Sequence, residues 1–205
     1  MTDHPLIRPA RPDDAPLAAV TFRLSMGEFA DYLFGPNGRS VEMALIRLFS
    51  RNAGRFGYKH AFVIEHHRRA LGMLIAFPGK EINRLCYAAA RFLPMAFGMG
   101  VFGFIARSFS FSSIREAEAD EYYISNLAVL PAAHGQGYGP RLLHYAEEQA
   151  RAHGLSKLSL LVSPTNKTAL RLYKKHGFEI VATIHHENPI ASYHRMVKEL
   201  ASLVE

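Results

Sequence analysis

Hydrophobic and polar positions follow two different periods along the first eighty residues, which predicts alternating strands and helices. Apolar runs at residues 61–64 and 71–76 are separated by a short basic turn and predict a β-hairpin. Residues 6–10 predict an earlier strand. Apolar side chains at helical spacing follow the acidic capping pair at 13–14 and recur between residues 41 and 49, so two helices are expected before the hairpin.

The second half of the chain has sharper element boundaries. Residues 121–130 predict a strand, which is followed by a glycine-rich turn and a helix expected to begin at Pro140. A further strand, a helix closed by a glycine and two final strands come next. We therefore expect one α/β domain over residues 1–205, with a mixed, twisted sheet and helices on both faces. The last four elements are expected at 158–162, 166–176, 179–184 and 193–197.

The segment from about residue 80 to 119 interrupts this order as a hydrophobic insertion between the third and fourth strands. Arg91 is the only charged residue between positions 85 and 106, and this length would suffice for a membrane span. Pro94 and the glycines at 98, 100 and 103 argue against a span. We expect helices that form an apolar lid, with a subunit contact in a homodimer or a membrane-surface helix as alternatives.

Composition narrows the cellular and chemical context. Hydrophobic residues make up 49% of the 205 residues and charged residues 20%, enough to bury a core. The single cysteine, Cys86, excludes an intrachain disulfide and a multi-thiolate zinc site, which fits a reducing compartment. No secretory signal pattern opens the sequence, so a cytoplasmic protein is expected.

The formal net charge of +6 favours an anionic partner, which could be a nucleic acid, a phospholipid or a phosphorylated small molecule. The basic residues are scattered and no aromatic–basic stripe links them, so nucleic-acid binding is not expected. Metal binding is not expected either. The adjacent histidine pairs at 66–67 and 185–186 would point to opposite faces of a strand.

The glycine-rich turn from His134 to Gly139 is a candidate anion site. Backbone N–H groups in the first turn of a helix have no intrahelical partner, and glycines let the backbone approach an anion closely. The spacing fits neither the dinucleotide fingerprint nor the Walker loop. The turn therefore predicts a cradle for the phosphates of some other ligand.

Two segments carry a resemblance to a known family. The run Leu127-Ala128-Val129-Leu130-Pro131, followed by His134-Gly135-Gln136-Gly137-Tyr138-Gly139, resembles the acetyl-coenzyme A motif of the GNAT N-acetyltransferases. The later Asn166-x-x-Ala169-x-x-x-Tyr173-x-x-x-Gly177-Phe178 resembles the second signature of that family. His134 departs from the pattern, because the family usually has Arg or Gln there, and a neutral histidine gives the diphosphate no permanent charge.

The resemblance implies a GNAT fold in which two central strands splay apart after a bulge near residues 126–129. The pantetheine arm would pair with the freed backbone there, and the diphosphate would rest on the glycine turn. The cofactor-binding residues implied in this way are Leu127, Ala128, Val129, His134, Gly135, Gln136, Gly137, Tyr138, Gly139, Pro140, Arg141, Asn166, Ala169 and Tyr173.

Two side chains are candidates for the chemistry. Tyr173 lies seven residues after Asn166, so both share a helix face, and in the family this tyrosine protonates the leaving thiolate. Glu121 is the candidate base, because a carboxylate occupies this position in the ribosomal-protein N-terminal acetyltransferases, which residues 120–129 resemble. In the histone-acetylating branch the carboxylate falls where this chain has Tyr123, which could instead position a water or the acceptor.

The expected activity is transfer of an acetyl group from acetyl-coenzyme A to a primary amine, by direct attack in a ternary complex. The acceptor could be a peptide or a small molecule, and the insertion favours one with an apolar portion. The alternative is a module of the same fold that senses coenzyme A without turnover. Intact Asn166 and Tyr173 favour the enzyme.

Overall fold

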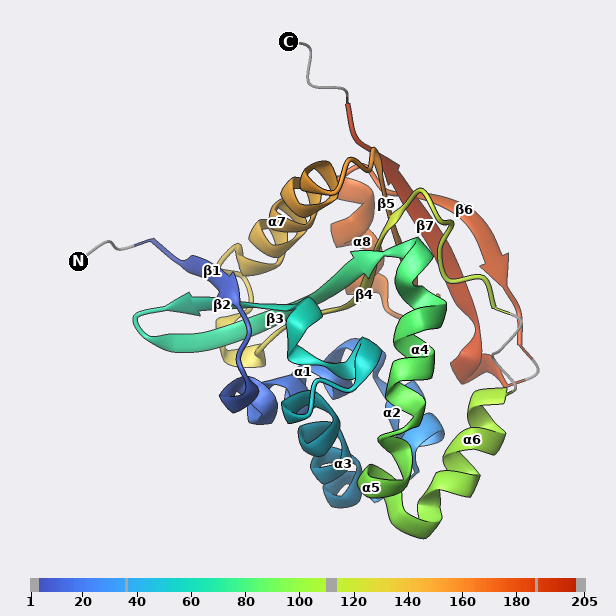
Figure 1. Ribbon diagram of the computed structural model, residues 1–205. Coiled ribbons are helices and arrows are strands. Elements are labelled where there is room, and N and C mark those ends of the chain that lie inside the picture. The colour runs from blue at the N-terminus through green and yellow to red at the C-terminus, as the bar shows by residue number, and fades with distance from the viewer. Residues whose placement is uncertain (1–3, 36, 110–113, 187, 202–205) are drawn as a thin grey trace.

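The computed structural model describes residues 4–35, 37–109, 114–186 and 188–201 (Figure 1). In that part of the chain a seven-stranded mixed sheet has the order β1-β2-β3-β4-β5-β7-β6. Neighbouring strands run antiparallel except β4 and β5, which are parallel. The strands are β1 (Leu6–Pro9), β2 (Ala61–His66), β3 (Arg69–Pro78), β4 (Tyr122–Val129), β5 (Lys157–Val162), β6 (Glu179–Ile184) and β7 (Tyr193–Glu199).

Helices cover both faces of the sheet, which confirms the predicted α/β architecture. In Figure 1, α7 lies above the β2–β3–β4 arm, whereas α1 and α3 lie below it. Among the described residues, the insertion between β3 and β4 forms three further α-helices, and helices were expected there. The helices are α1 (Ala15–Met26), α2 (Glu28–Phe34), α3 (Gly38–Ser50), α4 (Ile82–Ala90), α5 (Leu93–Phe97), α6 (Val101–Phe109), α7 (Tyr138–Ala152) and α8 (Lys167–Lys175).

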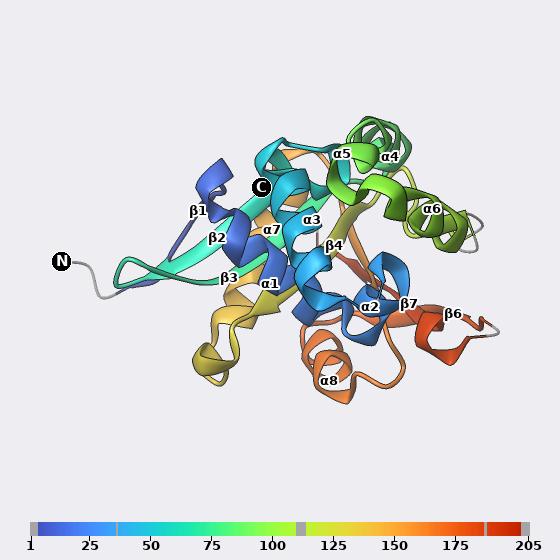
Figure 2. The ribbon, with the colours of Figure 1, turned by 90° about the horizontal axis from the view of Figure 1, so that it is seen from below.

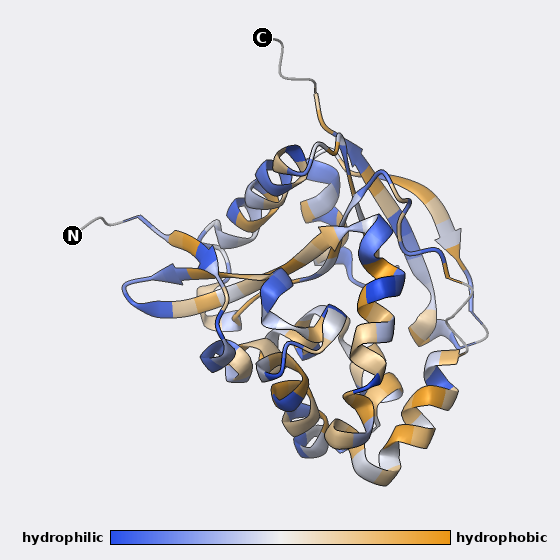
Figure 3. Cartoon of the chain, in the orientation of Figure 1, coloured by the Kyte–Doolittle hydropathy of each residue, from blue (hydrophilic) through white to orange (hydrophobic). Residues whose placement is uncertain are grey.

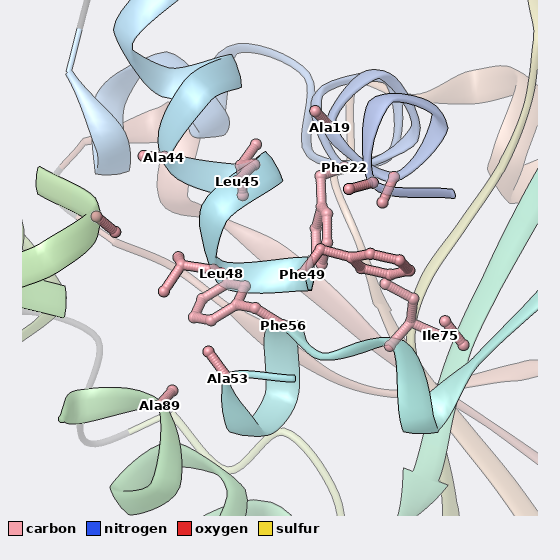
Figure 4. Close-up of a cluster of buried hydrophobic side chains, with 14 of the residues drawn as sticks. Ala19, Phe22, Ala44, Leu45, Leu48, Phe49, Ala53, Phe56, Ile75 and Ala89 are labelled. Atoms are coloured by element: carbon pink, nitrogen blue, oxygen red, sulfur yellow. The ribbon is translucent and has the colours of Figure 1, made fainter. Parts of the chain in front are cut away.

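Two hydrophobic clusters fill the two faces. On one face α1 and α3 pack on β3, where Phe22, Phe49 and Ile75 are almost fully buried (Figure 4). On the other face α7 and α8 pack on β4 and β5 through residues such as Leu142 and Leu160. The face of each strand residue follows from strand alternation, so Tyr122 and Tyr123 enter opposite clusters.

The insertion is anchored in the first of these clusters. Leu85 and Phe104 belong to the same buried group as α1 and α3. Gly54, in the short helical turn Gly54–Phe56, has a positive φ of 54°, and a Cβ there would lie 2.0 Å from the carbonyl oxygen of Leu85. Only glycine therefore lets α4 approach this closely. Figure 2 shows α4, α5 and α6 beside α2 and α3.

Apolar side chains also reach the outside of the insertion. Hydrophobic residues dominate α5 and α6 in Figure 3, and Met99 and Phe102 are 84% and 68% exposed. Among the described residues no single helix is long and apolar enough to cross a membrane. The pair Gly79–Ala90 and Leu93–Phe109 passes that test together, with a bend of 56° between its halves.

Three local expectations differ from the structure. Helix α7 begins at Tyr138, so Pro140 is its third residue, where a missing N–H is still tolerated. Helix α2 was not expected, because its seven residues are too few to show a clear period. His67 lies in the β2–β3 turn with a positive φ of 49°, and its ring stacks on that of His66 at 4.0 Å instead of pointing to the opposite face.

Candidate active site

The two parallel strands at the centre of the sheet, β4 and β5, separate along part of their length. We call the opening between them the seam. β4 pairs with β5 only from Tyr122 to Ile124 and continues to Val129 bonded to β3 alone. The β3–β4 register shifts between Ile75 and Ala76, which leaves Ser125 as the extra residue of a β-bulge. The bulge thus lies one residue before the range that the sequence suggested, and the strands part directly after it.

The freed backbone of β4 faces this seam. The amide of Leu130 donates to the carbonyl of Leu71 on the β3 side, at 2.7 Å. Because consecutive strand residues point their polar groups to opposite sides, Val129 and Leu127 face the seam, and Ala128 faces β3. His134 donates from Nε2 to the Val129 carbonyl, at 2.8 Å. The histidine that departs from the family pattern therefore caps one carbonyl of the seam.

The glycine turn forms the wide end of the seam. Gly135 and Gly137 have φ values of 77° and 81°, and a Cβ at either position would meet nothing within 4 Å. Glycine is needed here for its backbone conformation rather than for lack of space. Gly137 is also the N-cap of α7, and because glycine has no side chain, no side-chain cap accepts a hydrogen bond from the first N–H groups of the helix. The N–H groups of Tyr138 and Gly139 are the first of these.

The side chains in and beside this turn differ in their exposure to solvent. Gln136 and Arg141 have exposed side chains and can reach a ligand at the turn. The Tyr138 side chain is 4% exposed, and its hydroxyl hydrogen-bonds Nδ1 of His66 at 2.8 Å. Only the backbone of Tyr138 is therefore left to contact a ligand.

Helix α8 lies close to the glycine turn. Leu172 reaches within 3.5 Å of the point where a Cβ of Gly139 would lie. Asn166 is the N-cap of α8, and its Oδ1 accepts a hydrogen bond from the amide of Ala169 at 3.0 Å. This bond orients the exposed Asn166 side chain and leaves its amide nitrogen free to donate.

Tyr173 is held in the α8–sheet core. Its ring is 8% exposed and packs on Phe178 with the ring centroids 5.7 Å apart. Burial raises the pKa of the phenol to about 12, so it keeps its proton at neutral pH. Its hydroxyl makes no hydrogen bond with the residues that the structure describes, which leaves the proton available to a ligand.

Glu121 lies at the N-terminal end of β4, away from the seam. Its carboxylate accepts from Nη2 of Arg195 at 2.5 Å and from the amide of Glu118 at 2.9 Å, and the residue is 3% exposed. These contacts join β7, β4 and the end of the insertion. Glu121 does not border the cavity described next.

A cavity of about 540 Å³ opens on the α1–α2 face of the sheet, beside the seam. We call it the acceptor cavity, after the amine acceptor that the family resemblance implies. Residues of α1, α2, the insertion, β4, β5 and β7 line it. The lining residues are Phe22, Ser25, Met26, Phe29, Leu33, Arg55, Phe56, Ile82, Asn83, Cys86, Tyr87, Ala89, Ala90, Leu93, Phe104, Ser108, Ile114, Glu116, Tyr123, Ser125, Asn126, Leu161 and Tyr193.

An ion pair lies in the wall of this cavity. Arg55 donates two hydrogen bonds to the carboxylate of Glu116, at 2.8 and 2.7 Å, and Tyr123 donates a third at 2.7 Å. Burial alone would raise the pKa of Glu116, but Arg55 outweighs it, so the pKa lies below its usual range. Burial next to Glu116 raises the pKa of the Tyr123 phenol.

Arg55 and Glu116 were not predicted as site residues, because no motif in the sequence marks them. Cys86 lies in the insertion, away from both signatures in sequence. The fold brings it into the cavity wall, where Nη1 of Arg55 lies 3.5 Å from its sulfur. Tyr123 stands where the histone-acetylating branch has its carboxylate, and it does line the cavity.

Comparisons with known proteins agree with this architecture. A sequence model of the acetyltransferase (GNAT) family matches residues 45–178, more than half of the chain. The chain is 39% identical over 74 residues to GCN5-related N-acetyltransferase 6, chloroplastic, of Arabidopsis thaliana. It is 44% identical over 59 residues to [ribosomal protein bS18]-alanine N-acetyltransferase of Haemophilus ducreyi. The first match covers 36% of this chain and 26% of the Arabidopsis protein, and the second covers 29% of this chain and 41% of the Haemophilus protein. The matched part is therefore less than half of each relative.

Solved structures show the same fold over nearly the whole chain. An N-acetyltransferase from Staphylococcus aureus Mu50 superposes with a TM-score of 0.69 at 22% identity, covering 94% of this chain and 99% of that one. The ribosomal-protein-S18-alanine N-acetyltransferase of Escherichia coli gives 0.57 at 16% identity, covering 97% and 95%. The seam, the glycine turn and the family match lead to one conclusion: this chain belongs to the acetyltransferase (GNAT) family.

Proposed function

We propose that this protein transfers an acetyl group from acetyl-coenzyme A to a primary amine within a ternary complex. The observation that carries the proposal is the seam itself, which has unpaired β4 backbone along one side and the glycine turn at its wide end. In this assignment Leu127 and Val129 pair with the pantetheine arm. The amides from Gly135 to Gly139 hold the diphosphate.

The proposed chemistry needs one proton donor on the protein. The amine nitrogen bonds to the thioester carbonyl carbon and releases a proton to solvent, and the carbon–sulfur bond breaks. Tyr173 gives its phenolic proton to the departing thiolate and regains one from water. A buried phenol whose hydroxyl has no partner among the described residues suits this role.

The family resemblance implied that Glu121 is the general base, but its contacts support a structural role instead. Its oxygens are already held by Arg195 and by the Glu118 amide, and it lies outside the acceptor cavity. We assign Glu121 to joining β4, β7 and the insertion. No carboxylate base is then required from this position, and an amine can react once it has lost its proton in solution.

Two measurements test the proposal. Calorimetric titration with acetyl-coenzyme A should show binding at a single site. A thiol assay with a panel of primary amines should then show release of coenzyme A that depends on the amine. Binding without release for any amine would favour a sensor of coenzyme A, and absence of binding would contradict both assignments.

A further inference from the structure

The acceptor cavity reaches the seam at its inner end. Ser125 and Asn126 belong to the bulge at which β4 leaves β5, and Leu161 lies on β5 opposite them. The Asn126 amide donates to Ser25 at 2.8 Å and accepts from Ser125 at 3.0 Å, so polar groups gather at this end. An amine nitrogen held here would lie at the point where the strands part.

The outer part of the cavity has apolar walls and a mouth along α4. Side chains such as Phe22, Phe29 and Phe104 line the walls. Asn83, Tyr87 and Ala90 also line the cavity but are exposed, which places the opening beside α4. A volume of about 540 Å³ lies within the usual range for sites that enclose a small molecule.

The charges of this cavity cancel. Among the described lining residues the only charged side chains are Arg55 and Glu116, and each is bound to the other through two hydrogen bonds. A second charge on the acceptor would therefore be buried without a partner. That applies both to the carboxylate of an amino acid and to the second ammonium of a diamine, and burial of an unpaired charge is strongly unfavourable.

We infer that the acceptor cavity binds a monoamine whose remaining part is apolar and uncharged, with the amine at the bulge and the apolar part among the aromatic side chains. This inference rests on the proposed function and names its substrate class. It excludes polyamines and free amino acids as good acceptors.

Matched pairs of acceptors test the charge argument directly. 2-Phenylethylamine and L-phenylalanine share a ring and differ by a carboxylate, and hexylamine and hexane-1,6-diamine differ by a second amine. The member with one charge should have a kcat/KM about a hundredfold higher in each pair, because its partner buries an unpaired charge. Equal values within a pair would overturn the inference.

The single cysteine provides a readout that needs no turnover. Cys86 lines the cavity, so 2-phenylethylamine should slow its alkylation by iodoacetamide in the full-length protein without coenzyme, and L-phenylalanine should not. Alkylation at an unchanged rate would remove the amine from this cavity. If no amine gives thiol release, the proposed function fails, and protection of Cys86 still decides what the cavity binds.

Two matched variants place the amine in this cavity. Ala90→Trp adds bulk at the mouth and should raise KM for 2-phenylethylamine at least about tenfold without changing the affinity for coenzyme A. Ala106→Trp makes the same change at an exposed position of α6 that does not line the cavity, and it should leave both values unchanged. The same KM for both variants would contradict the location.

Discussion

The carboxylate of Glu116 is held by the guanidinium of Arg55 through two hydrogen bonds in the wall of the acceptor cavity, across 61 residues of sequence. The pair joins the loop before β2 to the end of the insertion. It also leaves the cavity without net charge. Because each side chain is bound to the other, we assign these two residues a structural role and not a catalytic one.

Breaking this pair should destabilise the protein. Arg55→Met leaves Glu116 without its charged partner and should lower the free energy of unfolding by about 3 kcal/mol, measured by urea denaturation. Arg23→Met removes an exposed pair with Asp31 and should cost less than about 1 kcal/mol. The double variant Arg55→Met/Glu116→Leu should recover most of the loss. Equal costs for the two single variants would contradict the structural role.

Replacing Glu121 distinguishes a structural role in the sheet from a role as the general base. Glu121→Gln leaves Arg195 without its charged partner and should lower the free energy of unfolding by about 3 kcal/mol. The kcat of the folded variant should stay within a few-fold of wild type. A kcat that fell about a hundredfold and recovered as the pH rose would restore Glu121 as the general base.

Two glycines at opposite ends of α7 form a matched pair of variants. Gly137 and Gly154 have φ values of 81° and 68°, and a Cβ at either would meet nothing within 4 Å. Each change to Ala should therefore cost about 1 kcal/mol of stability through backbone strain. Only Gly137→Ala should weaken coenzyme A binding, about tenfold or more, in a calorimetric titration. Equal affinities for the two variants would place the diphosphate elsewhere.

The dependence of turnover on pH follows from the state of Tyr173. A proton donor acts below its pKa, and burial raises the pKa of this phenol to about 12. The kcat should therefore show no falling limb near pH 10, where an ordinary tyrosine loses its proton. The kcat/KM should rise with pH until the amine itself is deprotonated, near pH 10 for an alkylamine. A fall of kcat centred near pH 10 would contradict a buried phenol as the donor.

The sequence was most informative where function depends on the local backbone. The glycine turn and the start of α8 near Asn166 follow from short-range rules of turns and helix ends, so they could be predicted with errors of one or two residues. The splayed strands were implied by the family resemblance, and the bulge lies one residue before the range given for it. The start of α7 shows the limit of such rules, because Pro140 is tolerated anywhere in the first turn.

The acceptor cavity could not be predicted in this way. It is assembled from segments between Phe22 and Tyr193, and no short-range pattern records that Arg55 meets Glu116. The role of Glu121 was equally hidden, because its partner Arg195 lies 74 residues away. Family resemblance pointed to a carboxylate at this position, and only the tertiary contacts show that it is already paired.

The most direct test of the account compares Tyr173→Phe with wild type in two assays. The variant should bind acetyl-coenzyme A with unchanged affinity while its kcat falls about a hundredfold, because the ring remains and the proton donor is lost. Tyr145→Phe on α7 removes a phenol whose ring packs on Phe62 of β2, and it serves as the control. An unchanged kcat for Tyr173→Phe, with coenzyme A still bound, would contradict the central claim that this phenol protonates the departing thiolate.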